Sequence, residues 1–230
     1  MSLNDLHLTV SCVVFDLDNT LTDRSASIRQ FAWLFYRDFR HALDESITLE
    51  AVHQVIEQGD GGGYRPKETM FLEIQTHMQW IKTPTIEIIS DYWYRMSAQS
   101  MQLRPDVHAT LKELLHRDLR LGIITNGKTD VQNATIDATY LREYFSIVVI
   151  SEASGFRKPD PQIFNLALSV LNVAPQNAVY IGDHPQSDVE GARNAGLEAI
   201  WFAGVHPWPE TLPPPQHQIT QMAQLLELLV

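Results

Sequence analysis

Short apolar runs that alternate with helical patterns dominate the chain after about residue 101. Strands that alternate with helices form βαβ units, which build a parallel sheet with right-handed crossovers. We therefore expect an α/β fold with a doubly wound, Rossmann-like parallel sheet. The predicted strands are residues 10–15, 121–124, 146–150, 178–181 and 197–202, and the predicted helices are 106–117, 128–139, 160–171, 187–195 and a closing helix at 219–229.

One long segment interrupts this alternation after the first predicted strand. Its apolar residues fall at helical spacing, and it contains no convincing alternating strand. The aromatic residues Phe31, Trp33 and Phe35 are expected to pack in its core. We therefore expect a small helical domain at residues 23–100, inserted into a core domain made of residues 1–22 and 101–230. Such an insertion can close over the edge of the sheet as a lid.

A glycine-rich stretch at residues 59–63 lies inside this helical segment. It is not a P-loop, because no Gly-Lys-Ser/Thr follows it and it does not follow a strand. We interpret it as a flexible loop of the lid, and we expect Tyr64, Arg65 and Lys67 to contact substrate. The alternative is an ordinary connection between two helices.

Composition narrows the class of protein. The 230 residues include one cysteine, Cys12, so no internal disulfide can form. A net charge of −11 argues against nucleic acid as a partner, since binding to phosphates depends on Lys and Arg. No apolar run reaches the length of a membrane helix, and the N-terminus shows no signal-peptide pattern. We expect a soluble cytoplasmic protein, without a membrane partner, that acts as a monomer or a homodimer.

Polar residues follow three of the predicted strands at the point where each strand ends. Asp16 and Asp18 follow the first, Thr125 and Asn126 end the second, and Asp183 follows the strand at 178–181. Ligands of open parallel sheets bind at the carboxyl ends of the strands. If these strands are neighbours, the three clusters form one site.

Four segments in this order resemble the motifs of the haloacid dehalogenase-like (HAD) hydrolase superfamily. The segments are Phe15-Asp16-Leu17-Asp18-Asn19-Thr20-Leu21-Thr22, Thr125-Asn126-Gly127, Lys158-Pro159 and Gly182-Asp183-His184-Pro185-Gln186-Ser187-Asp188. The resemblance is to the phosphatase branch with a helical cap inserted after the first motif. It implies a Rossmann-like core with a small helical cap, and it covers about residues 10–202 apart from the insertion.

The resemblance also implies catalytic roles. Asp16 would attack phosphorus to form an aspartyl-phosphate, which water then hydrolyses. Asp18 would serve as general acid for the leaving oxygen and as general base for the water. Lys158 would hold Asp16 and, together with Thr125 and the backbone N–H of Asn126, would bind the phosphate.

A magnesium site follows from the same resemblance. Its ligands would be Asp16, the backbone carbonyl of Asp18, and Asp183, since Mg²⁺ prefers an octahedral set of oxygen ligands. Asp188 would support the metal, either directly or through water. Its alternative role is that of a carboxylate favoured by the helix dipole at a helix start.

The favoured function is a Mg²⁺-dependent phosphatase that acts on a small phosphorylated metabolite, either nucleotide-like or a sugar phosphate. A phosphomutase would use the same four motifs. A haloacid dehalogenase would share the fold and the nucleophile, but it would need neither a metal nor the carboxylate of Asp18. A binding module without catalysis is disfavoured, because Asp16, Asp18, Lys158 and Asp183 are all present.

Overall fold

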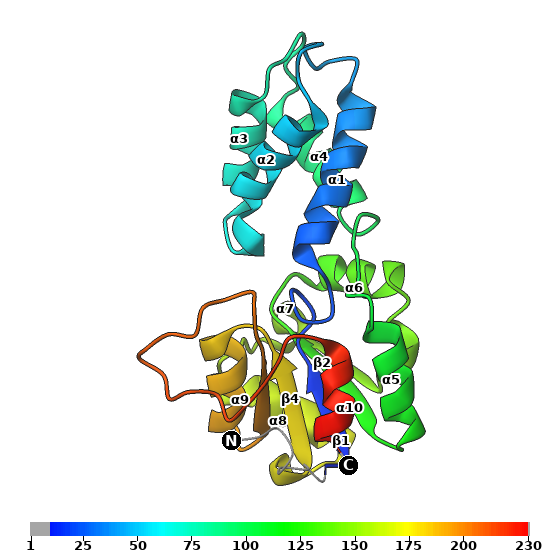
Figure 1. The fold of residues 1–230 in the computed structure, drawn as a ribbon, viewed down its shortest axis with the longest axis vertical. Helices are drawn as coiled ribbons and strands as arrows, with labels where there is room; N and C mark the ends of the chain where they lie inside the picture. Colours follow the sequence, from blue (N-terminus) through cyan, green and yellow to red (C-terminus); the bar gives the residue numbers. More distant parts are fainter. Residues whose placement is uncertain (1–9, 230) are drawn as a thin grey trace. The chain divides into compact units, whose positions relative to one another are not determined.

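The chain divides into two compact units. The computed structural model describes residues 10–229, and the N-terminal residues on which the signal-peptide expectation rests lie outside this range. One unit is Asp23–Gln102, and the other comprises the described residues up to Thr22 and from Leu103 onward (Figure 1). Within the second of these, Thr22 and Leu103 form an antiparallel bridge. The two places where the chain leaves and re-enters this unit are therefore adjacent.

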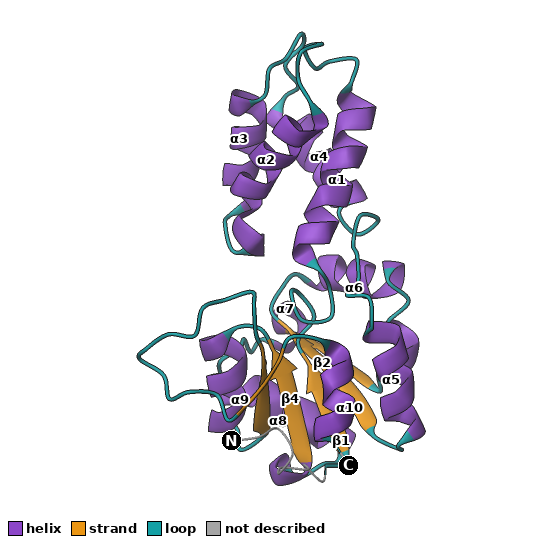
Figure 2. Ribbon diagram, viewed as in Figure 1, coloured by secondary structure: helices purple, strands orange, loops and turns teal. Residues whose placement is uncertain are grey.

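A six-stranded parallel sheet forms the centre of the larger unit (Figure 2). Its order is β3-β2-β1-β4-β5-β6, so β1 lies between β2 and β4. Every described neighbour pair is parallel, which confirms the doubly wound, Rossmann-like α/β core. The strands are β1 (Cys12–Phe15), β2 (Arg120–Thr125), β3 (Ile147–Ile150), β4 (Ala178–Gly182), β5 (Glu198–Phe202) and β6 (His217–Ile219).

Helices cover both faces of this sheet. Val13 and Phe15 of β1 face one apolar core, while Cys12 and Val14 face the other, because side chains alternate along a strand. All four side chains are fully buried. The first face packs mainly against α5 (Val107–His116), α6 (Thr129–Ala138) and α10 (Leu225–Leu228), and the second against α8 (Pro161–Leu171) and α9 (Gly191–Asn194), with α7 (Ser151–Ser154) following β3.

Two predicted helices of this unit are wrong in detail. The predicted helix at 187–195 begins earlier, as a π-helical turn at Pro185–Glu190 that continues into α9. The predicted helix at 219–229 begins later, as a 3₁₀ turn at Met222–Gln224 that continues into the short α10, and its first predicted residue, Ile219, lies in β6 instead. Across residues 10–229, no helix has the length and apolar character needed to cross a membrane.

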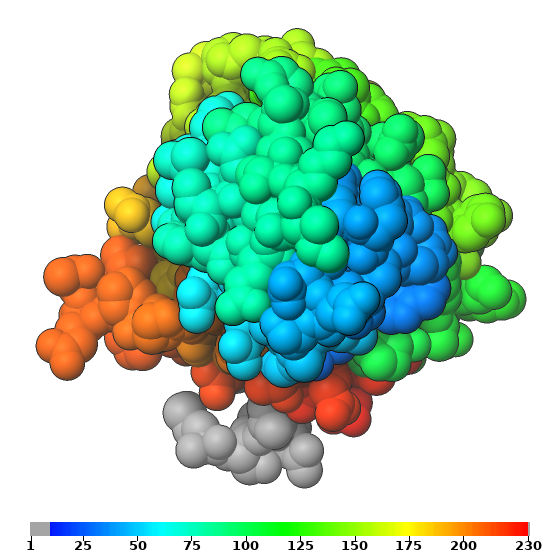
Figure 3. All heavy atoms as spheres, turned by 90° about the horizontal axis from the view of Figure 1, so that it is seen from above, coloured from blue at the N-terminus to red at the C-terminus, as the bar shows by residue number. Residues whose placement is uncertain are grey.

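The smaller unit is a bundle of four helices. They are α1 (Arg24–Phe39), α2 (Leu49–Asp60), α3 (Lys67–His77) and α4 (Ile86–Met96). Phe31 and Phe35 are buried in its core as expected, but Trp33 is 44% exposed, because it lies on the outer side of α1. Asp23, Thr48 and Thr85 cap the starts of α1, α2 and α4 by accepting a backbone N–H. The atoms of this unit, blue to green-cyan in Figure 3, form a continuous packed surface.

The glycine-rich stretch is more ordered than the sequence indicates. Gly59 and Asp60 are the last residues of α2, and residues 61–63 form a short 3₁₀ turn. Gly61 has φ 53°, which is a left-handed conformation that glycine adopts at the end of a helix without strain. The expectation of a loop over all of 59–63 is therefore wrong at its first two residues.

Candidate active site

The polar residues after β1, β2 and β4 lie at one edge of the sheet, because the three strands are neighbours. Asp16 directly follows β1, and its backbone N–H donates to the carbonyl of Ile181 on β4 at 2.8 Å. Its side chain is almost fully buried. The hydroxyl of Thr20, in the turn after β1, lies 3.0 Å from Oδ2 of Asp16 and 3.4 Å from Oδ1 of Asp183. This turn therefore fixes the carboxylate of Asp16 against that of Asp183.

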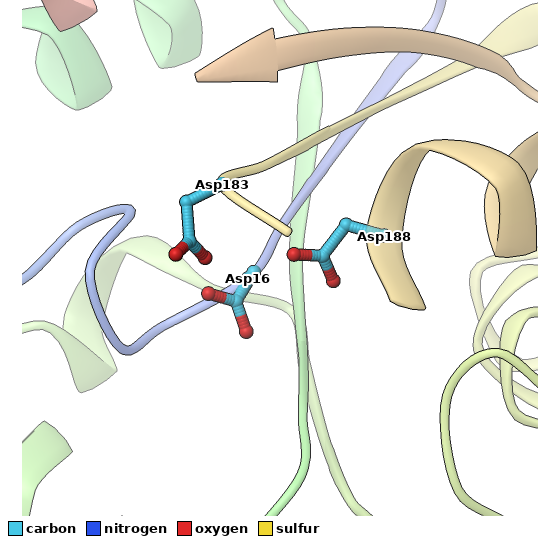
Figure 4. Close-up of side chains that lie close together, drawn as sticks. All are labelled: Asp16, Asp183 and Asp188. Atoms are coloured by element: carbon cyan, nitrogen blue, oxygen red, sulfur yellow. The ribbon is translucent and has the colours of Figure 1, made fainter. Parts of the chain in front are cut away.

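Three buried carboxylates point toward one another at this edge (Figure 4). One oxygen from each of Asp16, Asp183 and Asp188 lies within 4.8 Å of the others. The side chain of Asp188 packs directly against Gly182. A Cβ atom at Gly182 would come within 3.0 Å of the Asp188 carboxylate, so glycine is needed at this position. The backbone N–H of His184 donates to Oδ2 of Asp188 at 3.0 Å. The missing Cβ of Gly182 and the backbone N–H of His184 therefore allow the carboxylate of Asp188 to lie close to that of Asp183.

Lys158 is the cation of this cluster. Its Nζ lies 2.6 Å from Oδ1 of Asp16, 2.7 Å from Oδ1 of Asp188 and 2.9 Å from the hydroxyl of Tyr180. The backbone of Lys158 makes two hydrogen bonds with the side-chain amide of Asn126, one in each direction. Asn126 thereby ties the loop that carries Lys158 to the end of β2.

Burial and charge act together on the pKa values of these groups. Burial raises the pKa of Asp16 well above its ordinary value, and Asp188 and Asp183 raise it further against the opposing charge of Lys158. Burial alone would lower the pKa of Lys158, but Asp16 and Asp188 raise it overall, so the amine stays protonated. Burial, followed by the charge of Asp188, raises the pKa of Tyr180 well above its ordinary value, so its hydroxyl remains a donor.

The donor set fits a magnesium ion. Three carboxylates face one ammonium group, which leaves an excess of negative charge in a buried position. All three candidate ligands are oxygen donors, as Mg²⁺ prefers. The carboxylate of Asp18 is not part of this trio, and the assignment of its backbone carbonyl as a ligand stays a prediction.

Asp18 and Thr125 meet at a second part of the site. The side-chain amide of Gln132, on α6, donates to Oδ2 of Asp18 at 2.8 Å and to Oγ1 of Thr125 at 2.6 Å. Asp18 is half-buried and Thr125 is buried. The two groups predicted to protonate the leaving group and to bind phosphate are therefore joined by one amide.

Several residues of this site were not predicted from the sequence. Tyr180 and Gln132 contact predicted catalytic groups from β4 and α6. His206 places Nε2 3.3 Å from Oδ2 of Asp183, and the indole of Trp201 donates to the Asp183 carbonyl at 2.8 Å. Only Tyr180 carries a signal in the sequence, since a tyrosine in a buried strand needs a partner for its hydroxyl.

The predicted lid residues lie in the smaller unit. Tyr64 is 55% exposed. Arg65 forms an ion pair with Glu73 at 2.6 Å, and Lys67 pairs with Asp60 at 2.5 Å. Arg65 and Lys67 thus have partners within their own unit, and a contact of any of the three with substrate stays a prediction.

The sequence matches a known family over most of its length. Residues 13–202 match the haloacid dehalogenase-like hydrolases. The chain belongs to this family. It is accordingly a hydrolase, and the resemblance seen in its four motifs is confirmed.

Curated relatives of the chain carry the names of phosphatases. It is 29% identical over 237 residues to the N-acylneuraminate-9-phosphatase of Homo sapiens, covering 96% of this chain and 94% of that protein. It is 44% identical over 99 residues to the phosphoserine phosphatase of Thermus thermophilus, covering 43% of this chain and 40% of that protein.

Solved structures share the fold. The HAD-hydrolase YfnB from Bacillus subtilis, bound to magnesium, aligns with a TM-score of 0.73 at 21% identity, covering 94% of this chain and 96% of that one. The L-2-haloacid dehalogenase from Xanthobacter autotrophicus aligns with a TM-score of 0.65 at 19% identity, covering 94% of this chain and 96% of that one. At these identities the likeness concerns the fold.

Proposed function

We propose that the chain is a Mg²⁺-dependent phosphatase that hydrolyses a small soluble phosphomonoester through an aspartyl-phosphate on Asp16. One observation carries the proposal. The buried Asp16 carboxylate lies 2.6 Å from the ammonium of Lys158 and within 4.8 Å of two further acids. Asp18, two residues on, supplies a carboxylate outside this cluster. A nucleophile, a fixed cation, an oxygen-rich metal site and an acid–base group are therefore present together.

In the proposed reaction, Asp16 attacks phosphorus and Asp18 gives a proton to the leaving oxygen. Asp18 then takes a proton from the water that hydrolyses the aspartyl-phosphate. Lys158, the hydroxyl of Thr125 and the backbone N–H of Asn126 hold the phosphoryl oxygens. Held by Asp16, Asp183, Asp188 and the carbonyl of Asp18, Mg²⁺ would offset the repulsion between the anionic nucleophile and the anionic phosphate.

We propose the helical unit as the lid of this site, with Tyr64 as a contact to substrate. The two connections at Thr22 and Leu103 are adjacent, which supports a hinge, since a lid can rotate about two neighbouring connections whose flanking residues change φ and ψ. Two curated relatives are named for a sugar-acid phosphate and an amino-acid phosphate. This supports a small phosphorylated metabolite, with a sugar phosphate favoured over a nucleotide. We further propose that the enzyme acts in the cytoplasm.

Two other reactions fit the same fold. A dehalogenase needs no proton for the leaving halide, so it gives no use to Asp18 and to the Gln132 amide that holds it at 2.8 Å. A phosphomutase would return the phosphoryl group to substrate instead of to water. Release of inorganic phosphate separates the proposed phosphatase from both.

The test is phosphate release from a panel of sugar phosphates, nucleoside monophosphates and flavin mononucleotide, with Mg²⁺ and with EDTA. The proposal predicts release that requires Mg²⁺ and that is strongest for one chemical class. Isomerised phosphate esters without free phosphate would indicate a mutase. A parallel assay measures halide release from 2-haloacids. Halide release that EDTA does not affect would contradict the proposal.

A further inference from the structure

A buried amide, that of Gln132, connects two groups of the proposed site. Gln132 lies in the second turn of α6, and its side chain is 4% exposed. Its Nε2 lies 2.8 Å from Oδ2 of Asp18 and 2.6 Å from Oγ1 of Thr125. An amide nitrogen carries two hydrogens, so each oxygen receives one of them. Because both N–H groups of this buried amide donate hydrogen bonds, they hold the two acceptor side chains in place.

The hydrogen bond to Asp18 determines which oxygen can carry an acidic proton. A protonated carboxyl group has one O–H and keeps its other oxygen as an acceptor. Oδ2 of Asp18 already accepts from Gln132. This hydrogen bond orients the carboxyl group and leaves Oδ1 as the oxygen that is free to transfer a proton.

The hydrogen bond to Thr125 has a similar consequence. The Oγ1 atom of Thr125 accepts a hydrogen from Gln132, so its own hydrogen is left to donate elsewhere. A phosphoryl oxygen is an acceptor of this kind. The same amide thus orients the acid group and one phosphate donor at the same time.

Gly127 provides the room for this arrangement. A Cβ atom at Gly127 would lie 2.8 Å from both Cγ and Cδ of Gln132, which is closer than real Cβ contacts. The Thr-Asn-Gly turn after β2 therefore needs glycine because the Gln132 side chain crosses it. The turn, the amide and Asp18 form one packed group, although Asp18 and Gln132 are 114 residues apart.

We propose that Gln132 is a positioning residue, whose amide directs the proton of Asp18 and the hydroxyl of Thr125 during transfer of the phosphoryl group. This inference rests on the proposed phosphatase activity. Gln132 should therefore matter most for esters with an alkoxide leaving group, because such a group needs protonation by Asp18 and a stabilised phenolate needs it much less.

The test compares kcat/KM for the best alkyl phosphate of the panel with kcat/KM for p-nitrophenyl phosphate. This parameter covers the steps up to release of the leaving group. Gln132→Met keeps the length of the side chain and removes its donors. We expect it to lower kcat/KM roughly 10- to 100-fold for the alkyl ester, as partial loss of general acid catalysis requires, and less than about 5-fold for p-nitrophenyl phosphate. Gln132→Leu, which also lacks the two N–H donors and adds no charge, should show the same selectivity.

Two controls make the result specific. Gln176→Met applies the same change at an exposed position at the other end of the sheet, before β4, and should leave both esters unaffected. Asp18→Asn should show the same leaving-group selectivity, and adding Gln132→Met to it should hardly change the ratio of the two kcat/KM values further, since Gln132 acts on the leaving group through Asp18. Thermal unfolding of each variant identifies those that do not fold.

Equal losses for the two esters in folded Gln132 variants would overturn the inference and leave the phosphatase activity intact. An additive change of the ratio between the two kcat/KM values in the double variant would also overturn it. A wild-type protein that releases phosphate from neither ester would contradict the proposed function itself, and the inference with it.

Discussion

At the scale of single residues, Asp16 is the group on which the proposed chemistry depends most directly. Asp16→Asn keeps the shape of the side chain and removes the nucleophile, so Mg²⁺-dependent phosphate release should fall by at least about 1,000-fold. The fold should survive, because burial and two neighbouring acids already disfavour the charged form of Asp16. Phosphate release and thermal unfolding measure the two effects. Substantial turnover by the Asp16→Asn variant would contradict the assignment of the nucleophile.

Tyr180 allows a subtler test of the same cluster. Its hydroxyl lies 2.9 Å from Nζ of Lys158 and 3.2 Å from Oδ1 of Asp188, and its raised pKa keeps it protonated. Tyr180→Phe should lower the free energy of unfolding by about 1–2 kcal/mol, as expected for a buried hydrogen-bonding group that loses its partner. We also expect kcat to fall a few-fold, because Lys158 loses one of its three partners. Tyr140→Phe removes a hydroxyl from a side chain that is 76% exposed and serves as the matched control.

The residues of the proposed site differ in how easily they can be predicted from the sequence. Asp16, Asp18 and Asp183 stand directly after apolar strands, so strand ends and motif order suffice to place them together. Gln132 is different, because its partner Asp18 is 114 residues away and neither its type nor its spacing marks it. Lys158 was placed only by its motif, since an isolated lysine is normally a solvated surface residue.

At the scale of helices, Asp60 joins three elements of the small unit. Its buried carboxylate, at the end of α2, pairs with Arg24 of α1 and Lys67 of α3, each at 2.5 Å. Asp60→Asn should lower the free energy of unfolding of this unit by about 2–4 kcal/mol, because two cations lose a buried partner. Asp91→Asn, at an exposed position of α4, is the control. Chemical or thermal unfolding followed by tryptophan fluorescence measures the difference, and equal stability of the two variants would contradict this role of Asp60.

The ion pairs of Asp60 with Arg24 and Lys67 also predict how the stability of the small unit depends on pH. Burial alone would raise the pKa of Asp60, but Arg24 and Lys67 outweigh it and hold the pKa below the ordinary value of 3.8. A carboxyl group with a lowered pKa stabilises the fold above the unfolded-state value and loses this contribution as the pH falls through the folded-state value. The stability difference between wild type and Asp60→Asn should therefore be constant above about pH 5 and should shrink below pH 3.8. A difference that grows on acidification would contradict the sign.

Elements with strong patterns were predicted well, and weakly patterned ones were not. The buried strands β1, β2 and β4 appear as continuous apolar runs, as central parallel strands do. The edge strand β6 has the sequence His-Gln-Ile, which is too short to give a strand pattern, so no strand was predicted there and its last residue, Ile219, was placed in the closing helix. Trp33 fits the helical spacing of α1 but lies outside the buried stripe, since periodicity fixes a face less sharply than it fixes an element.

At the scale of the whole molecule, the proposed Mg²⁺ site at the acid trio would link the stability of the larger unit to a divalent ion. The chain brings Asp16 together with Asp183 and Asp188 only when β1 and β4 are paired, so an ion held by all three binds the folded state alone. At a Mg²⁺ concentration of about 100 times Kd, such binding contributes about 2.7 kcal/mol. For a protein of this size, that corresponds to a rise in Tm of about 5–10 °C.

Asp183→Asn tests this linkage without any assay of turnover. It removes one ligand, so Mg²⁺ should raise the Tm of the variant far less than that of wild type, and EDTA should abolish the rise in both. Glu143→Gln, an exposed change of charge in the same unit, should keep the full rise. The stability of Asp60→Asn should respond to Mg²⁺ only through the larger unit, because its own acid belongs to the other one. An equal rise in Tm for wild type and Asp183→Asn would place the ion elsewhere, whereas a rise confined to proteins with all three acids would place it at the carboxyl ends of β1 and β4.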